Sequence, residues 1–410
     1  MTEDRQSAAS PPETDHRTLD IEARDASPND EPITVRVTGA EPGEEVTLVA
    51  TLEDADGVEW TSEATFTADG DGNVDCAEHA PDTGSYDAVE AMGWLWSMTS
   101  DADAPFARLS GLQHVDVTLR ATTDDAEVTR TVTRVLHDGD IETRPVERDG
   151  LVGTLYLPPG DGPHPGVIEL HGSGGRRADG TAKQLATNGY AALALTYFGE
   201  DHDALPDQLE RVPLSYGDDA ADWLRDQPEV ADGSVGLVGA SRGAEFALLL
   251  AAHRDWVGAV VSYAGSGVPW DIPSGEPAWT HDGVPVPHIE ADEHPIVTDL
   301  DDRDLDGNVP PVENAGGPIL LLSGQDDNIW NASRLSEVVV DRLDAHDFPH
   351  DYEHRTYDDC GHLIGTPYAP VAGIDDVDHA GGTSRGTVRA SEDAWPAVLD
   401  TLENSLKNEN

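Results

Sequence analysis

The chain has little positive charge. Its 410 residues include 24 lysines and arginines against 81 aspartates and glutamates, which gives a formal net charge of −57. Lys183 and Lys407 are the only lysines, and the acidic residues are spread along the sequence rather than gathered in a tail. Proteins that bind nucleic acid need clustered cations to neutralise phosphates, so this class is excluded. Dispersed carboxylates instead favour a halophilic surface that stays soluble in concentrated salt, where charge repulsion is screened.

Cysteine and long apolar segments are also scarce. The two cysteines, Cys76 and Cys360, lie far apart, so no disulfide framework is predicted and a reducing compartment is favoured. Residues 1–17 lack the basic and apolar regions of a signal peptide, and we expect this acidic N-terminal segment to be disordered. No segment approaches the roughly 20 apolar residues that a membrane span needs. We therefore expect a soluble, cytoplasmic protein without a membrane span.

The remaining sequence divides into two regions of different periodicity. Between residues 18 and 140, short segments alternate apolar with polar residues and are separated by turn-forming residues. This pattern predicts an antiparallel, immunoglobulin-like β-sandwich domain, and we expect its apolar segment 92–98 (MGWLWSM) to be buried. Between residues 141 and 410, continuous apolar strands alternate with helical segments. Here we predict a mostly parallel sheet with helices on both faces.

One pentapeptide indicates chemistry. Residues 239–243 (GASRG) match the pattern G-x-S-x-G, follow an apolar strand and precede a helical segment. This strand–turn–helix context is what an exposed, strained serine requires, so we predict Ser241 as a nucleophile. A second match, residues 382–386 (GTSRG), has no strand before it. We interpret its serine, Ser384, as a loop residue without a catalytic role.

A serine nucleophile needs a histidine base and a carboxylate that orients it. On the α/β-hydrolase fold these groups follow one another in the order serine, acid, histidine. The strand GPILLLSG is followed by Asp326 and Asp327, and His362 follows the last predicted strand. We expect His362 to be the base and Asp327 the acid, with Asp326 as the alternative acid. The order of these elements predicts a serine hydrolase of the α/β-hydrolase fold.

The oxyanion hole of this fold combines the backbone N–H after the nucleophile with donors from the loop after an early strand. The first donor is then the N–H of Arg242. The loop is residues 171–175 (HGSGG), in which we expect Ser173 and Gly174 to be the further donors and His171 to be structural.

Residues 269–317 are rich in Pro, Gly and Asp, and we expect this insertion to form a lid or a substrate-shaping loop. His281, His288 and His294 lie in it among acidic residues, but their spacing fits no rigid set of ligands. We therefore predict no metal site and no bound cofactor.

The sequence resembles the family of acyl-CoA thioesterases and bile acid-CoA:amino acid N-acyltransferases from about residue 19 to residue 406. In the first region the resemblance rests on EPITVRVTGAEPGEEVTLVATLEDADG and MGWLWSM. In the second it rests on GVIELHGSGG, NGYAALALTYFG, GLVGASRGAE, GQDDNIWNAS and GHLIGTPYAP. The resemblance implies an N-terminal thioester hydrolase domain and a C-terminal α/β-hydrolase domain of the BAAT type. It puts the family's nucleophile, acid and histidine on Ser241, Asp327 and His362.

The function that the resemblance implies is hydrolysis of fatty acyl-CoA to free fatty acid and CoA through an acyl-enzyme. The conjugating branch of the family is similar but carries cysteine as nucleophile, where this chain has Ser241. Three cations close to the oxyanion loop, Arg176, Arg177 and Lys183, are candidates for contact with the CoA phosphates. The alternatives are a carboxylester or dienelactone-type hydrolase, an acyl-CoA:amino acid N-acyltransferase, and a binding module with a vestigial hydrolase. In each enzymatic case the partner is a small-molecule acyl-CoA or ester.

Overall fold

The computed structural model describes residues 18–102, 106–199, 204–291, 300 and 305–407. The segment 1–17, for which the sequence predicts disorder, lies outside the described residues, as does His294.

Alternation of apolar and polar residues produces the expected sandwich. Its larger sheet has six strands in the order β2-β9-β8-β4-β5-β7. The bounds of these strands are β2 Ala26–Pro28, β4 Glu45–Glu53, β5 Glu59–Thr67, β7 Thr83–Gly84, β8 His114–Thr122 and β9 Glu127–Val135. In β4 and β5 every second side chain is buried, as a sheet with one covered face requires. All pairings in this sheet are antiparallel except that of the edge strand β2 with β9.

The second sheet of the sandwich has three short strands, β1 Asp20–Glu22, β3 Arg36–Thr38 and β6 Val74–Asp75, in the order β1-β3-β6. The segment 92–98 forms the one-turn helix α1, Gly93–Trp96, and packs into the core of the sandwich. The rings of Trp94 and Trp96 are buried there. The expectation that this segment is buried is confirmed.

The second region contains an eight-stranded sheet in the order β10-β11-β13-β12-β15-β16-β19-β20. The bounds of its strands are β10 Glu142–Arg148, β11 Leu151–Leu157, β12 Gly166–Leu170, β13 Ala191–Thr196, β15 Val235–Ala240, β16 Val257–Tyr263, β19 Ile319–Gly324 and β20 Tyr352–Tyr357. Pairings from β13 through β20 are parallel, and β11 is antiparallel to both of its neighbours. This is the mostly parallel sheet of an α/β hydrolase, as predicted.

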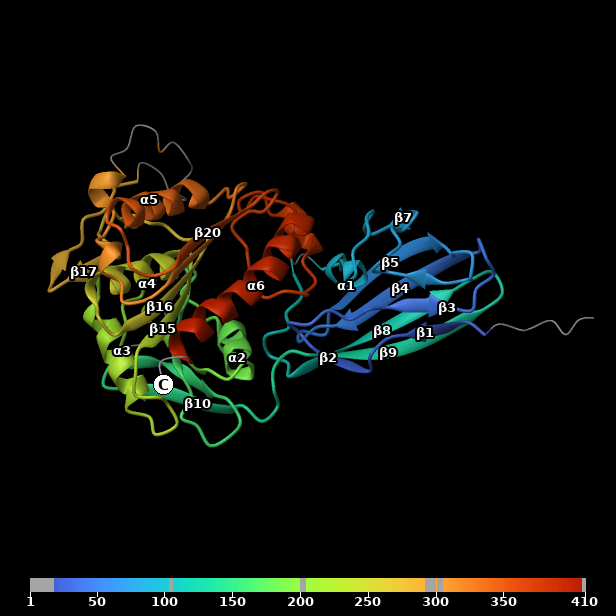
Figure 1. Cartoon of the computed structure of the whole chain (residues 1–410), viewed down its shortest axis with the longest axis horizontal. Helices are drawn as coiled ribbons and strands as arrows, with labels where there is room; N and C mark the ends of the chain where they lie inside the picture. Colours follow the sequence, from blue (N-terminus) through green and yellow to red (C-terminus); the bar gives the residue numbers. More distant parts are fainter. Residues whose placement is uncertain (1–17, 103–105, 200–203, 292–299, 301–304, 408–410) are drawn as a thin grey trace, which may run out of the picture.

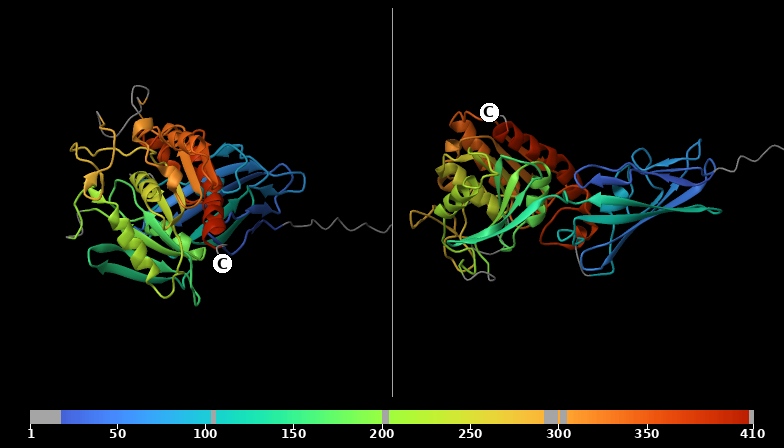
Figure 2. Two further views of the ribbon diagram at one scale, coloured as in Figure 1. Left: turned by 60° about the vertical axis from the view of Figure 1, so that its left-hand side comes forward. Right: turned by 90° about the horizontal axis from the view of Figure 1, so that it is seen from below.

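Helices cover both faces of this sheet because its strands are apolar on both faces. On one face lie α2, Asp179–Thr187, and α6, Ser384–Leu406; on the other lie α3, Ser215–Arg225, α4, Arg242–His253, and α5, Ala332–Ala345. Figure 1 and Figure 2 show α6 running between the eight-stranded sheet and the sandwich. None of the helices in the described ranges is both long and apolar enough to cross a membrane.

The insertion 269–317 is partly built into the core. Its strands β17, Trp279–His281, and β18, Val284–Pro285, pair with each other, and β17 also pairs with β14, Val212–Pro213. Two short 3-10 helices follow, η1 Asp306–Asn308 and η2 Val312–Asn314, and a third, η3 Ala372–Asp376, precedes α6. Residues 292–299 and 301–304 of the insertion lie outside the described residues.

Candidate active site

Ser241 occupies the turn between the end of β15 and the start of α4. Its φ of 55° and ψ of −119° lie in a region that residues with side chains rarely adopt, and such strain is concentrated at functional turns. The Ser241 N–H donates to the carbonyl of Tyr263 on the neighbouring strand at 2.8 Å, which holds the turn in register with the sheet. The serine is half-buried. The turn therefore presents the hydroxyl at the carboxyl edge of the sheet.

The two glycines of the segment 239–243 allow this turn to close. A Cβ atom at Gly239 would lie 2.4 Å from the carbonyl oxygen of Gly243. One at Gly243 would lie 2.0 Å from the carbonyl oxygen of Leu170 on β12. Because non-bonded atoms do not approach so closely, a larger residue at either position would push α4 away from the strands. In this segment the G-x-S-x-G pattern is therefore a packing requirement.

Asp327 and His362 form a hydrogen-bonded pair at the same edge of the sheet. Asp327 lies in the turn after β19, and His362 lies beyond the end of β20. The Nδ1 of His362 is 2.7 Å from Oδ2 of Asp327, and both side chains are largely buried. A carboxylate accepts from Nδ1–H, which leaves Nε2 as the basic nitrogen. Together with Ser241 after β15, the structure thus places a hydroxyl, an imidazole and a carboxylate along the carboxyl edge of the sheet.

The turn after β19 decides which of two adjacent carboxylates reaches the histidine. Oδ1 of Asp327 accepts from the backbone N–H groups of Ile329 at 2.9 Å and Trp330 at 3.2 Å, which leaves Oδ2 facing His362. Asp326 is exposed. The ring of Trp330 lies edge-on to the imidazole, with centroids 6.0 Å apart. The geometry pairs His362 with Asp327 rather than with Asp326.

The glycine loop 171–175 passes close to Ser241. A Cβ atom at Gly172 would be 3.3 Å from Cβ of Ser241, so there is little room for a side chain between them. The N–H of Gly175 donates to the carbonyl of Gly172 at 3.3 Å, and Ser173 and Gly174 at the turn are exposed. The two predicted loop donors are therefore accessible, and Gly172, which the sequence did not single out, is the residue of the loop where an added Cβ would meet Ser241.

His171 is packed into the base of this loop. Its ring stacks on that of Tyr197, with centroids 4.2 Å apart and 8° between the planes. The Tyr197 hydroxyl donates to the carbonyl of His171, and Nδ1 of His171 is 2.8 Å from the carbonyl of Gly172. Burial lowers the pKa of His171 to about 4, so its ring is neutral near pH 7. These contacts agree with the structural role expected for it.

The side chain of Arg242 turns into the protein. It forms a buried ion pair with Glu245 at 2.8 Å, and its guanidinium donates to the carbonyls of Trp270 and Asp271 in the insertion. Glu245, whose pKa is raised by burial, also accepts from the indole N–H of Trp279. The residue after Ser241 thus anchors the insertion to α4. Sequence reasoning missed Glu245, although an acidic residue three positions after Arg242 was the available signal.

The histidines of the insertion have other neighbours. His281 lies against the ring of His253, with centroids 4.5 Å apart, and Nδ1 of His288 is 2.8 Å from the carbonyl of Val286. Within the described ranges, no group of three or more His, Cys, Asp or Glu side chains is arranged to hold a metal ion.

The three candidate cations differ in their partners. Arg177 pairs with Asp179 at 3.4 Å, and Lys183 donates to the carbonyl of Ser110 in the sandwich at 3.2 Å. Arg176 is exposed and forms no ion pair with any residue that the structure describes. Arg176 follows the glycine loop directly in the chain.

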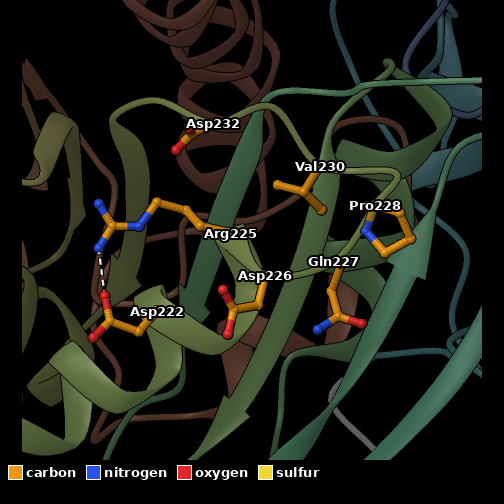
Figure 3. Close-up of a pocket in the computed structure, with 7 residues that line it drawn as sticks. All are labelled: Asp222, Arg225, Asp226, Gln227, Pro228, Val230 and Asp232. Carbon is orange, nitrogen blue, oxygen red and sulfur yellow. Dashed lines mark hydrogen bonds and ion pairs between the residues drawn. The ribbon is translucent and has the colours of Figure 1, made fainter.

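A cavity of about 620 Å³ lies at the opposite edge of the sheet (Figure 3). It is lined by Asp222, Arg225, Asp226, Gln227, Pro228, Val230 and Asp232. β15 begins just after this lining and ends at Ser241, so the length of a six-residue strand, roughly 20 Å, separates the two. Arg225 is paired with Asp222 at 2.6 Å. An acidic cavity so far from the serine is not the substrate site.

The hydroxyl of Ser384, in the second pentapeptide, lies within hydrogen-bonding distance of the carbonyls of Val371 and Ala372. Ser384 is not a loop residue, as we expected, but the first residue of α6, and it is buried. The backbone N–H of Gly386 donates to the Thr383 side chain, which caps the helix. That Thr-x-x-Gly start to a helix is the signal that the prediction overlooked.

Two parts of the chain match known protein families. Residues 30–148 match the family described as "Acyl-CoA thioester hydrolase/BAAT N-terminal region". Residues 212–408 match the one described as "BAAT / Acyl-CoA thioester hydrolase C terminal".

Two relatives illustrate the similarity along the chain. A peroxisomal succinyl-coenzyme A thioesterase of Mus musculus is 30% identical, over 93% of this chain and 95% of its own. Acyl-coenzyme A thioesterase 6 of the same species is 31% identical, over 96% of this chain and 97% of its own. Among solved structures, the dienelactone hydrolase of Anabaena variabilis is 19% identical with a TM-score of 0.40, over 65% of this chain and 99% of its own.

Proposed function

The chain belongs to the family of acyl-CoA thioester hydrolases and BAAT proteins, and on this basis we propose that it hydrolyses fatty acyl-CoA to free fatty acid and CoA. Its relatives over nearly the whole length are named as acyl-CoA thioesterases. We propose Ser241, Asp327 and His362 as the catalytic triad. The observation that carries this assignment is the Asp327–His362 hydrogen bond of 2.7 Å, which lies after strands whose carboxyl ends share one edge of the sheet with the strained serine.

The reaction has two halves. Oγ of Ser241 attacks the thioester carbonyl while Nε2 of His362 takes its proton, and the imidazolium is stabilised by Asp327. The N–H of Arg242 and donors from Ser173 and Gly174 stabilise the oxyanion of the tetrahedral intermediate. The C–S bond then breaks, and the proton passes from His362 to the CoA thiolate. Water, deprotonated by the same nitrogen, attacks the serine ester. The C–O bond to Ser241 then breaks, the fatty acid leaves, and His362 returns the proton to Oγ of Ser241.

Recognition of CoA needs local cations in so acidic a protein. A chain of net charge −57 repels the CoA phosphates, and in molar salt the Debye length of about 3 Å leaves only direct contacts effective. Arg176 is exposed and uncommitted beside the glycine loop, and Lys183 on α2 makes no ion pair within the described part of the chain. We propose that Arg176, assisted by Lys183, contacts the phosphates of CoA.

Hydrolysis is favoured over conjugation to an amino acid. The acyl-enzyme on Ser241 is an oxygen ester, which water activated by His362 attacks readily, whereas the conjugating branch of the family uses a cysteine thioester. The acidic chain also offers little attraction to the anionic group that an acceptor such as glycine or taurine carries. The alternative activity, carboxylester hydrolysis, would use the same proposed triad on an oxygen ester.

A substrate panel in molar potassium chloride separates these activities. It compares acyl-CoAs of several lengths, the matching acyl-N-acetylcysteamine thioesters and p-nitrophenyl esters, with glycine or taurine present in a parallel set. We expect the highest kcat/KM with acyl-CoA and free fatty acid as the main product by mass spectrometry. A preference for p-nitrophenyl esters, or acyl-glycine as main product, would overturn the proposal.

The role of Arg176 has its own control. We expect Arg176→Gln to lower the ratio of kcat/KM for acyl-CoA to that for the acyl-N-acetylcysteamine about tenfold, the loss of one charge-assisted contact. Arg225→Gln removes an arginine from the opposite edge and should leave this ratio unchanged. An unchanged ratio in Arg176→Gln would remove Arg176 from the CoA site.

The arrangement of the chain supports three further proposals. We propose residues 18–140 and 141–410 as the two domains and the insertion 269–317 as a wall or lid of the acyl site, since Arg242 and Glu245 anchor its base. Limited proteolysis tests the domain division.

We propose the cytoplasm as the compartment, consistent with two free, buried cysteines, and cell fractionation tests it.

A further inference from the structure

The second pentapeptide belongs to a segment that contacts both turns of the acid–histidine pair. Gly381 pairs as an isolated β-bridge with Asp327, and Gly382 pairs in the same way with Cys360. The N–H of His362 donates to the carbonyl of Ala380 at 2.8 Å. Residues 380–382 therefore lie against the acid turn on one side and the histidine turn on the other. We call residues 380–386 the bracket.

The bracket approaches these turns as closely as a backbone can. Gly381 and Gly382 have φ values of 71° and 73°, in the left-handed region that favours glycine. A Cβ atom at Gly381 would lie 1.9 Å from the carbonyl oxygen of Asp326, and one at Gly382 would lie 2.1 Å from the backbone nitrogen of Gly361. Both conformation and space thus require glycine here. Any side chain would push the acid turn or the histidine turn out of place.

Thr383 continues the contact to the histidine turn. Its N–H donates to the carbonyl of Asp359 at 2.7 Å, and its hydroxyl lies 3.2 Å from the same oxygen. That hydroxyl also caps α6 by accepting from the N–H of Gly386 at 3.0 Å. A Cβ atom at Gly386 would lie 2.0 Å from the Asp359 carbonyl oxygen. The start of α6 is therefore packed directly onto the turn that leads to His362.

The far side of the bracket is anchored on the sandwich. The hydroxyl of Ser384 is 3.0 Å from the carbonyl of Val371, whose own N–H donates to the carbonyl of Trp96 in α1. Arg385 forms ion pairs with Asp87 and Glu90 of the sandwich. One turn further along α6, the side chain of Val388 joins the core of the sandwich. Figure 1 shows the start of α6 beside α1.

We propose that Gly381, Gly382 and Thr383 are positioning residues that hold Asp327 and His362 in hydrogen-bonding register, with the sandwich as their support. The proposal rests on the proposed triad. Asp327 and His362 are carried by separate strands, β19 and β20, and their turns must stay aligned for the 2.7 Å bond to form. Misplacement of a catalytic group by about 1 Å can cost 10²-fold in rate, so an element that ties both turns together contributes to turnover.

Two variants test the bracket, with a matched control for each. Gly381→Ala adds one methyl group at a left-handed position where there is no room. Gly57→Ala adds one at a similar φ, 77°, in a sandwich hairpin where nothing lies within 4 Å. Thr383→Val keeps the volume of the side chain but removes the hydroxyl, whereas Thr383→Ser keeps the hydroxyl. If Gly381→Ala fails to fold, the comparison of Thr383→Val with Thr383→Ser still tests the proposal.

The measurements are kcat and KM for acyl-CoA and the downfield ¹H resonance of the proton between His362 and Asp327. We expect Gly381→Ala to lower kcat about 10²-fold and Thr383→Val several-fold, with KM little changed, because the bracket does not touch substrate. In both, the downfield proton should shift or broaden. Gly57→Ala and Thr383→Ser should behave like the wild type.

The outcomes separate this proposal from the triad assignment. If Ser241→Ala abolishes turnover while Thr383→Val and any folded Gly381→Ala keep wild-type kcat and an unshifted proton, the bracket has no positioning role. A rise in KM with constant kcat would overturn it as well. If Ser241→Ala keeps wild-type turnover, the triad itself is wrong, whatever the bracket variants do.

Discussion

The chain contains the same pentapeptide pattern twice, and the two copies have opposite environments. Ser241 follows a buried strand, has a strained backbone with φ at 55° and is half-buried at the edge of the sheet. Ser384 follows a loop, begins a regular helix, and its hydroxyl lies within hydrogen-bonding distance of the carbonyls of Val371 and Ala372. Both serines stand at a helix start, and the preceding element differs: β15 leads to Ser241 at the sheet edge, whereas a loop leads to Ser384.

The arginines after the two serines repeat the contrast. Arg242 is buried, pairs with Glu245 and anchors the insertion, while Arg385 reaches across the surface to Asp87 and Glu90 of the sandwich. Buried pairs of this kind are costly to break because one charge is left without a partner, and exposed pairs contribute little. Each pentapeptide thus ties its helix to a different neighbour.

The largest expected difference between the two copies is in turnover. Ser241→Ala should lower kcat by roughly 10⁴–10⁶-fold, since the members of a triad act as a unit. Ser384→Ala should retain kcat within about threefold, because its hydroxyl touches only backbone carbonyls. The measurement is steady-state hydrolysis of an acyl-CoA, with labelling by a fluorophosphonate probe to identify the modified serine. If Ser384→Ala abolished turnover and Ser241→Ala did not, the assignment of Ser241 as the nucleophile would be wrong.

The next test asks whether His362 depends on Asp327 rather than on Asp326, as the geometry indicates. Asp327→Asn should lower kcat about 10²–10⁴-fold, because an amide no longer fixes the tautomer of His362. Asp326→Asn, one residue away and exposed, should cost little. Stopped-flow or steady-state assays of both variants at one pH make the comparison. Equal, modest losses would mean that neither residue orients the histidine.

For stability, the order of the two serines should be reversed: replacing Ser384 should destabilise the protein, and replacing Ser241 should stabilise it. Ser384→Ala removes a buried hydroxyl from two carbonyls and should lower the free energy of unfolding by about 1–3 kcal/mol. Ser241→Gly relieves a strained backbone conformation and should raise it by about 1 kcal/mol. Urea unfolding in molar salt measures both. If Ser241→Gly is destabilising, the turn at residue 241 stores no strain.

The smallest expected effect concerns pH and the helix that follows the second copy. Burial raises the pKa of Glu392 on α6 to about 7, and the nearby charge of Glu90 adds to the shift. A raised pKa means that the folded state keeps the proton longer than the unfolded state. Stability therefore falls as pH rises from about 4.5 to 7.

Glu392→Gln should reduce this decline by about 1 kcal/mol, allowing for solvent screening of a partly exposed group. Glu169, whose pKa burial raises to about 8, contributes a decline of the same sign that persists in the variant. Thermal unfolding between pH 4.5 and 7.5 provides the measurement, with Glu403→Gln, on the same helix, as the control. An identical slope in Glu392→Gln and the wild type would contradict the prediction.

Local periodicity was sufficient to predict most of the architecture. The alternating segments gave the sandwich strands, and the continuous apolar segments gave β12, β13, β15, β16 and β19, because burial on one face or on two leaves different patterns in the sequence. The sequence also predicts a serine, an acid and a histidine after strand ends, and the structure places Ser241, Asp327 and His362 after β15, β19 and β20.

Other features depended on contacts between distant segments. That Asp327 rather than Asp326 meets His362 follows from the two N–H groups that hold Oδ1 of Asp327. The inward turn of Arg242 needs the carbonyls of Trp270 and Asp271, and the role inferred for Gly381 needs the acid turn against it. The sequence by itself determined which elements form and which groups reach the sheet edge, because those depend on local burial patterns. Which neighbours they meet was decided by tertiary packing, because the space around each backbone is set by residues far away along the chain.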